Sequence, residues 1–144
     1  MMYMLDTNIC IFAIKGAKTE MYGHISRALG EKRAEGLCIS SITLAELEFG
    51  VANSSSPEKN AVALMNILSV LEVMPFEESA AAEYGKIRAE LQRTGRVIGS
   101  LDMLIAAHSK ACGCILVTNN TREFKRVENL VVEDWFMDIA TPQG

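Results

Sequence analysis

Residues that build the common metal and nucleophile sites are scarce in this chain of 144 residues. The only histidines are His24 and His108, which form no His-x-x-x-His pair, and the four cysteines lack Cys-x-x-Cys spacing. These absences argue against a zinc site and against a Ser-His-Asp arrangement. The sequence also has no glycine-rich loop of the kind that cradles a phosphate.

Long apolar runs and a strong excess of one charge are absent as well. The longest apolar stretches are interrupted well before the length that spans a bilayer, and no basic start leads into an apolar run. We therefore expect no membrane segment and no targeting leader. All four cysteines lie in or beside apolar segments, which predicts free thiols in a reducing cytoplasm. The net charge of −4 argues against nonspecific coating of nucleic acid, although clustered Lys and Arg could still form a basic rim.

Apolar residues, in contrast, are plentiful. Hydrophobic residues make up 49% of the chain and charged residues 22%, which is enough to bury the core of one domain. Short apolar runs alternate with longer amphipathic ones, the pattern of strand–helix units around a parallel sheet. The sequence thus predicts a single α/β domain over 1–144 with about five strands. The predicted strands are 3–5, 37–39, 71–74, 115–117 and 130–132, and the predicted helices are 7–15, 20–34, 41–52, 57–70, 77–94 and 100–111.

Acidic residues set among apolar neighbours suggest a metal site. Asp6 follows the first strand at its carboxyl end, where open parallel sheets bind ligands. Helix capping explains Asp6 equally well on local sequence, but if Thr7 or Asn8 is the cap, Asp6 can face the crevice. Asp102 falls in the first turn of a helix that Ser100 is expected to cap, where the helix dipole favours a carboxylate. Its neighbours one turn away are apolar, and a partly buried charge needs a partner.

The third acid is Glu46 or Glu48, and helical spacing does not choose between them. Residues two apart point to different sides of a helix, so we expect only one of them to reach the crevice. The segment 115–120 repeats the layout of the first strand, with Asn120 after the apolar run and Glu123 one turn later. Side-chain oxygens from several strand ends and one helix suit Mg²⁺ or Mn²⁺.

These segments, taken in order, resemble the PIN-domain ribonucleases, and in particular the VapC toxins of bacterial VapBC toxin–antitoxin pairs. The resemblance covers almost the whole chain. The VapC endonucleases for initiator tRNA share the Asp-Thr-Asn-Ile-Cys start and the Thr-Asn-Asn-Thr-Arg-Glu-Phe segment. Each motif is weak alone, whereas five in register are specific. The matching stretches are MLDTNICI at 4–11, ISSITLAEL at 39–47, IRAEL at 87–91, IGSLDMLIA at 98–106 and LVTNNTREF at 116–124.

The resemblance implies a PIN-domain-like α/β/α sandwich with a central, mainly parallel sheet. It places the metal-binding catalytic acids on Asp6, Glu46 and Asp102, and so selects Glu46 over Glu48. The fourth acidic position of many PIN domains falls on Asn120, which we include among the catalytic residues.

Asn120 supplies an amide oxygen without a charge, so the site should hold a second ion less firmly. Glu123, from the next turn, is the residue that would compensate. The resemblance also implies that the hydroxyl of Thr118 supports the metal-binding side chains.

The activity implied by the resemblance is Mg²⁺-dependent hydrolysis of RNA, with Mn²⁺ as an alternative ion and the anticodon region of initiator tRNA as the target. The implied partners are a VapB-type antitoxin and a second copy of the chain, for which the Met-rich helix 61–70 could supply an interface. A place in the core is the simpler expectation for Met65 and its neighbours.

Two other functions remain open at this stage. Aspartyl-phosphate phosphatases also begin with a strand that ends in Asp, but they need a second acid where this chain has Asn8. The other alternative is a PIN-like scaffold that binds RNA or protein without cutting, which Asn120 leaves possible.

Overall fold

A five-stranded parallel sheet in the order β3-β2-β1-β4-β5 forms the centre of the computed structural model, which describes residues 2–15 and 20–135. Every pair of neighbouring strands is parallel, and β1 lies in the middle of the sheet. The predicted α/β class with about five strands is therefore confirmed. The strands are β1 (Tyr3–Leu5), β2 (Leu37–Ser40), β3 (Glu72–Met74), β4 (Ile115–Val117) and β5 (Val132–Glu133).

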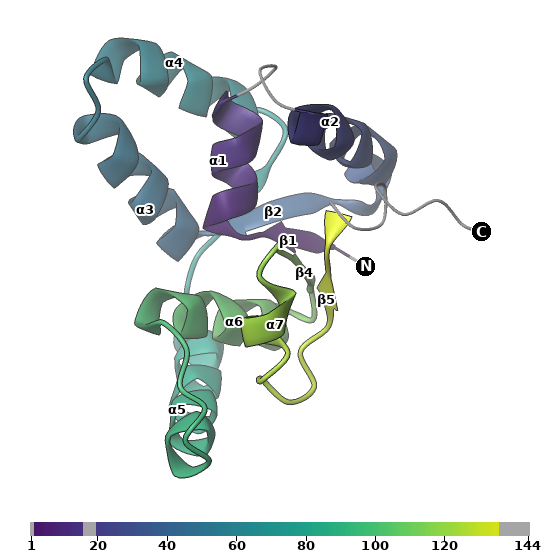
Figure 1. Ribbon diagram of the computed structural model, residues 1–144, viewed down its shortest axis with the longest axis vertical. Helices are drawn as coiled ribbons and strands as arrows, with labels where there is room; N and C mark the ends of the chain where they lie inside the picture. Colours follow the sequence, from purple (N-terminus) through teal and green to yellow (C-terminus); the bar gives the residue numbers. More distant parts are fainter. Residues whose placement is uncertain (1, 16–19, 136–144) are drawn as a thin grey trace.

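Helices cover both faces of this sheet, as expected for an α/β/α sandwich (Figure 1). The first four helices lie on one face, α5 and α6 lie on the other, and the short α7 connects β4 to β5. Since parallel strands need crossover connections, the helices between them have to pack on the faces of the sheet. The helices are α1 (Thr7–Lys15), α2 (Glu20–Lys32), α3 (Ser41–Ala52), α4 (Pro57–Leu68), α5 (Glu78–Arg93), α6 (Ser100–Cys112) and α7 (Thr121–Phe124).

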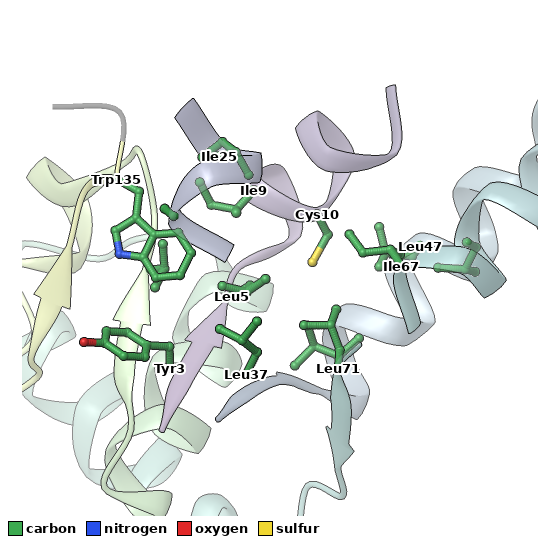
Figure 2. Close-up of a cluster of buried hydrophobic side chains, with 14 residues drawn as sticks. Tyr3, Leu5, Ile9, Cys10, Ile25, Leu37, Leu47, Ile67, Leu71 and Trp135 are labelled. Atoms are coloured by element: carbon green, nitrogen blue, oxygen red, sulfur yellow. The ribbon is translucent and has the colours of Figure 1, made fainter. Parts of the chain in front are cut away.

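Each face of the sheet has its own hydrophobic core. The core under α1 to α4 includes Leu5, Ile9, Leu37 and Leu47 (Figure 2). At its edge the rings of Tyr3 and Trp135 pack with centroids 5.5 Å apart. The core under α5 and α6 is built around Met4, Cys38, Ile105, Leu116 and Phe124. The central strands β2, β1 and β4 are therefore buried on both faces, which explains why they read as apolar runs.

The structure differs from the sequence prediction mainly at the edges of the sheet and at helix ends. Strand β5 begins at Val132 instead of residue 130, and α7 was not among the predicted helices. Helix α4 ends at Leu68, two residues early. The expectation of a core position is wrong for Met65, whose side chain is 68% exposed on α4, but it is confirmed for its neighbours Leu64 and Ile67, which are buried.

The strand order reverses direction at β1, because the chain goes from β1 to β2 on one side and returns to β4 on the other. In open α/β sheets ligands bind at such a switch point, outside the carboxyl ends of the strands. Asp6 follows β1 at this place, and its backbone N–H donates to the carbonyl of Val117 in β4 at 3.0 Å. No helix of the described residues is long and apolar enough to cross a membrane.

Candidate active site

Asp6 lies between β1 and α1 with only 4% of its surface exposed. Its Oδ1 accepts a hydrogen bond from the backbone N–H of Ile9 at 2.9 Å, and the hydroxyl of Thr118 also donates to it. Asp6 itself therefore caps α1, which is one of the alternatives that the local sequence left open. Burial raises the pKa of Asp6 to about 6 despite these hydrogen bonds, and the charge of Asp102 adds to the rise.

Asp102 lies half-buried in the first turn of α6. Burial raises its pKa, and the charges of Glu123 and Glu46 raise it further. The N-cap of α6 is Gly99 and not Ser100, and no side chain caps the helix. A Cβ atom at Gly99 would lie 3.3 Å from Oδ2 of Asp102, so the glycine leaves the space that this carboxylate occupies.

Glu46 reaches the same region from α3. Its Oε1 accepts a hydrogen bond of 2.6 Å from the hydroxyl of Thr7 in α1, and the side chain is half-buried. Glu48 is exposed, so Glu46 is the acid of this helix that points toward the crevice. Sequence reasoning treated Thr7 only as a possible helix cap and missed this contact. No local signal could have shown it, because the two residues are 39 positions apart.

The segment after β4 adds an amide and a fourth carboxylate. Thr118 is buried, and its Oγ1 accepts from the backbone N–H of Asn120 at 2.9 Å. The side-chain Nδ2 of Asn120 donates to Oε2 of Glu123 at 2.9 Å. Asn120 therefore orients Glu123, whose charge in turn acts on Asp102.

The four carboxylates form one electrostatic cluster without a positively charged side chain in contact. Among residues 2–15 and 20–135, no salt bridge involves Asp6, Glu46, Asp102 or Glu123. The raised pKa values of Asp6 and Asp102 are the expected result of burial and uncompensated negative charge. Carboxylate and amide oxygens in such surroundings fit a hard divalent cation.

In this conformation, however, no three His, Cys, Asp or Glu side chains of the described residues are arranged to hold one ion. One oxygen of Glu46 is engaged by Thr7, and one oxygen of Glu123 by Asn120.

Comparisons with known proteins identify the family of this chain. The family model of the PIN domain matches residues 3–130. The tRNA(fMet)-specific endonuclease VapC of Shigella flexneri is 44% identical over 92% of this chain and 97% of its own length. Ribonuclease VapC2 of Rickettsia felis is 43% identical over 94% of this chain and 98% of its own length.

Solved structures show the same likeness. A chain of VapBC2 from Rickettsia felis, bound to a DNA fragment from their promoter, superposes with a TM-score of 0.86 at 41% identity, over 92% of this chain and 98% of that chain. A chain of DNA-bound VapBC from Salmonella typhimurium also superposes with a TM-score of 0.86, at 44% identity, over 94% of this chain and 98% of that chain. PIN-domain ribonucleases generally depend on a divalent metal. The protein therefore belongs to the PIN-domain family and, within it, to the VapC ribonucleases.

Proposed function

We propose that this protein is the toxin of a type II toxin–antitoxin pair and cleaves tRNA as a Mg²⁺-dependent endoribonuclease, with residues 1–144 as a single PIN domain. The observation that carries the proposal is the cluster of Asp6, Glu46 and Asp102, brought together from three separate segments without a cationic partner. The name of the Shigella flexneri relative supports initiator tRNA as the target. The resemblance to the family makes its anticodon region the expected site of cleavage, where the bases of a single-stranded loop are free to approach a protein site.

In this proposal Asp6 and Asp102 hold the ion and Glu46 completes the set of carboxylates. Thr7 and Thr118 keep two of these carboxylates in place through their hydroxyls. Asn120 is the proposed catalytic residue at the fourth acidic position of the family, and Glu123, which the Asn120 side chain orients, supplies the charge that an amide lacks. Mn²⁺ is the alternative ion, since it accepts the same oxygen ligands.

When bound, the ion lowers the pKa of the attacking water and offsets negative charge on the phosphate. Asp6 contributes a carboxylate whose direction is fixed by the Ile9 N–H and by the Thr118 hydroxyl. Asp102 lies in the first turn of α6, and its carboxylate occupies the space that Gly99 leaves by having no side chain. Attack of the water oxygen on phosphorus breaks the bond to the 3′ oxygen and leaves a 5′-phosphate and a 3′-hydroxyl.

A VapB-type antitoxin is the proposed inhibitor, in line with the VapBC complexes among the structural relatives. A groove of about 310 Å³ between α1, α3 and α4 has Glu46 at its border and is mainly apolar, with Ile11, Leu47 and Val51 among its lining residues. Such a groove suits an amphipathic segment of a partner. A Lys or Arg from that segment could pair with the acidic cluster and displace the ion.

A second copy of the chain is the other proposed partner. Val62 and Met65 lie one helical turn apart on α4 and are both exposed, which leaves an apolar stripe on the surface. If this stripe is the homodimer interface, the double substitution of Val62 and Met65 by Lys should yield a monomer in light scattering. A dimer that persists in this variant would exclude α4 as the interface.

The test of the proposed function is cleavage of purified total tRNA in Mg²⁺ and in EDTA, with the cut ends mapped by sequencing. The expected result is one metal-dependent cut in one tRNA. Asp102→Asn should abolish the cut with the fold intact, because it removes a charge and little volume.

Glu48→Gln is the matched control, since it neutralises an exposed acid two residues from Glu46 on the same helix. It should cleave like the wild type. If the folded wild-type protein cuts no RNA with either Mg²⁺ or Mn²⁺, the scaffold alternative replaces the nuclease.

A further inference from the structure

Four cations lie in the segments that carry Asp102 and Glu123, one in the loop before α6 and three in α7 and the turn that follows it. We call Arg96, Arg122, Lys125 and Arg126 the cationic rim. Within the described part of the chain none of them forms a salt bridge, a property that they share with Lys15, Arg27, Arg33, Lys59 and Arg88. Positive charges in neighbouring segments repel one another, so an anionic partner from outside the chain would stabilise the rim.

The rim is held next to the acidic residues by a contact between distant segments. Nη1 of Arg126 donates to the backbone carbonyl of Val97 at 3.3 Å, and this joins the turn after α7 to the loop that precedes α6. The same loop leads to Gly99, which lies against the carboxylate of Asp102. Arg96 is three residues before Gly99, no more than about 11 Å of chain.

Arg122 is adjacent to Glu123, whose charge raises the pKa of Asp102. Three of the four rim cations therefore belong to the same short segment as Glu123, and no salt bridge joins the rim to the carboxylates within the described residues. A carboxylate cluster with a cationic rim in neighbouring segments is the arrangement expected where the carboxylates bind a metal ion and the rim binds a polyanion.

Exposed apolar side chains accompany the rim. Val97 is 47% exposed and Leu101 is 45% exposed, and these two residues flank Gly99 just before Asp102. Apolar surface beside cations suits unpaired bases, which offer flat faces next to a charged backbone. A duplex would hide those faces, so the surface fits a single strand better.

The charge distribution along the chain points the same way. Although the net charge is −4, the stretch 86–126 contains eight Lys or Arg and only three acids, two of which are Asp102 and Glu123. The excess of negative charge therefore lies elsewhere in the chain, and this stretch can attract a polyanion locally.

We propose that the cationic rim binds the phosphates of single-stranded RNA next to the scissile linkage, while Val97 and Leu101 contact its bases. The proposal rests on the proposed function and adds the direction in which the strand leaves the metal site: over the loop 94–99 and α7. Arg126 both contacts a phosphate and holds the loop through Val97.

The experiment compares Arg96→Gln, Arg126→Gln and Arg126→Lys with Arg33→Gln. Arg33 is an exposed arginine in the turn before β2, at the opposite end of the parallel strands from the carboxylates, and serves as the matched control. Two quantities are measured: KM and kcat for a short unstructured RNA in Mg²⁺, and the salt dependence of RNA binding by the same variants in the cleavage-deficient Asp102→Asn protein.

Each Gln substitution in the rim should raise KM roughly 3–10-fold with little change in kcat. It should also reduce the slope of log K against log salt by about 0.7 for each lost phosphate contact. Arg126→Lys should keep most of the salt slope, because it keeps the charge. Hydrolysis of bis(p-nitrophenyl) phosphate, a diester too small to reach the rim, should be unchanged.

The inference fails if the rim variants match Arg33→Gln in KM and salt slope while the wild type cleaves RNA. If the wild type binds RNA with the expected slopes but never cleaves it, the proposed nuclease function fails and the inference stands. Equal loss of bis(p-nitrophenyl) phosphate hydrolysis in the rim variants would show that the substitutions disturb the metal site, and would also overturn the inference.

Discussion

The imidazole of His108 lies 2.7 Å from the hydroxyl of Ser40, measured between Nδ1 and Oγ, and both side chains are almost completely buried. Ser40 is the N-cap of α3, where its Oγ also accepts from the backbone N–H of Ile42 at 3.0 Å. Since His108 belongs to α6, this contact ties the helix that carries Asp102 to the start of the helix that carries Glu46. A buried hydrogen bond between two non-acidic residues thus fixes the relative position of two acids.

His108→Phe should lower the free energy of unfolding by roughly 1–3 kcal/mol, because it removes buried hydrogen bonds to Ser40 and to the Pro75 carbonyl. Denaturation by urea at about pH 8 measures this change. His24→Phe is the control, since Nδ1 of His24 has no hydrogen-bond partner among residues 2–15 and 20–135. A smaller effect at position 108 than at position 24 would contradict the structural role of His108.

The loss in free energy of unfolding caused by His108→Phe should also depend on pH. Burial lowers the pKa of His108, although the hydrogen bond to Pro75 and the charge of Glu77 oppose this. At mildly acidic pH the imidazole of His108 is therefore protonated more readily in the unfolded chain than in the folded protein. The free energy of unfolding that the neutral imidazole contributes is lost as pH falls below about 6.5. The difference between wild type and variant should shrink between about pH 8 and pH 5. A constant difference over this range would show that His108 contributes by packing alone.

Asp6→Asn should stabilise the metal-free protein at neutral pH while abolishing cleavage. The folded state raises the pKa of Asp6 from 3.8 to about 6, so ionisation of Asp6 opposes folding and stability is lost as pH rises through this interval. Asparagine avoids the buried charge and keeps an oxygen for the Ile9 N–H. The expected gain in unfolding free energy in EDTA is roughly 1–3 kcal/mol above pH 6, and it should vanish near about pH 4.

The same pair of proteins reports on metal binding. Mg²⁺ should raise the Tm of the wild type, because the ion binds the folded state and neutralises its carboxylates. It should have little effect on the Asp6→Asn protein. If both proteins respond equally to Mg²⁺, Asp6 is not a ligand.

Local sequence was sufficient for those parts of the fold that are buried on every side. Strands β1 and β4 were predicted to the residue, because each is an apolar run inside the sheet that ends in polar residues at the start of a loop or helix. Strand β5 lies at the edge and pairs only with β4, so its limits depend on that pairing and not on its own composition. Met65 was misplaced because an apolar residue on an amphipathic helix can face a partner instead of the core.

Two of the acids of the candidate site could also be predicted from local sequence. Asp6 and Asp102 are charges among apolar neighbours, which is visible in the sequence, and the family resemblance then chose Glu46 over Glu48. The hydrogen bonds from Thr7 to Glu46 and from Asn120 to Glu123 were not predicted. The first joins two segments that meet only in the folded chain, and the second depends on the backbone conformation after β4.

Gly99→Ala should impair cleavage without unfolding the protein. The added Cβ would lie 3.3 Å from Oδ2 and 3.8 Å from Cγ of Asp102, so the carboxylate has to move by a few tenths of an ångström. The φ of −56° at Gly99 is ordinary for alanine, so backbone strain adds nothing. A misplaced catalytic group lowers kcat, here by roughly 10-fold or more.

Gly85→Ala is the control for that substitution. Gly85 lies in the middle of α5, and a Cβ there would meet no atom within 4 Å. Alanine at this position should raise the free energy of unfolding by about 0.5–1 kcal/mol and leave cleavage unchanged. Normal kcat in Gly99→Ala would show that the position of Asp102 tolerates the shift.

Thr7→Val should reduce activity through Glu46, although Thr7 itself carries no charge. Valine has nearly the same shape but cannot donate the 2.6 Å hydrogen bond to Oε1 of Glu46. The carboxylate then loses the contact that holds it between α1 and α3, and we expect a roughly 10-fold loss of kcat together with weaker apparent binding of Mg²⁺. Thr7→Ser keeps the hydroxyl and should restore both values close to those of the wild type. If valine and serine behave alike, the hydrogen bond to Glu46 has no part in catalysis, and Thr7 acts only through the packing of α1.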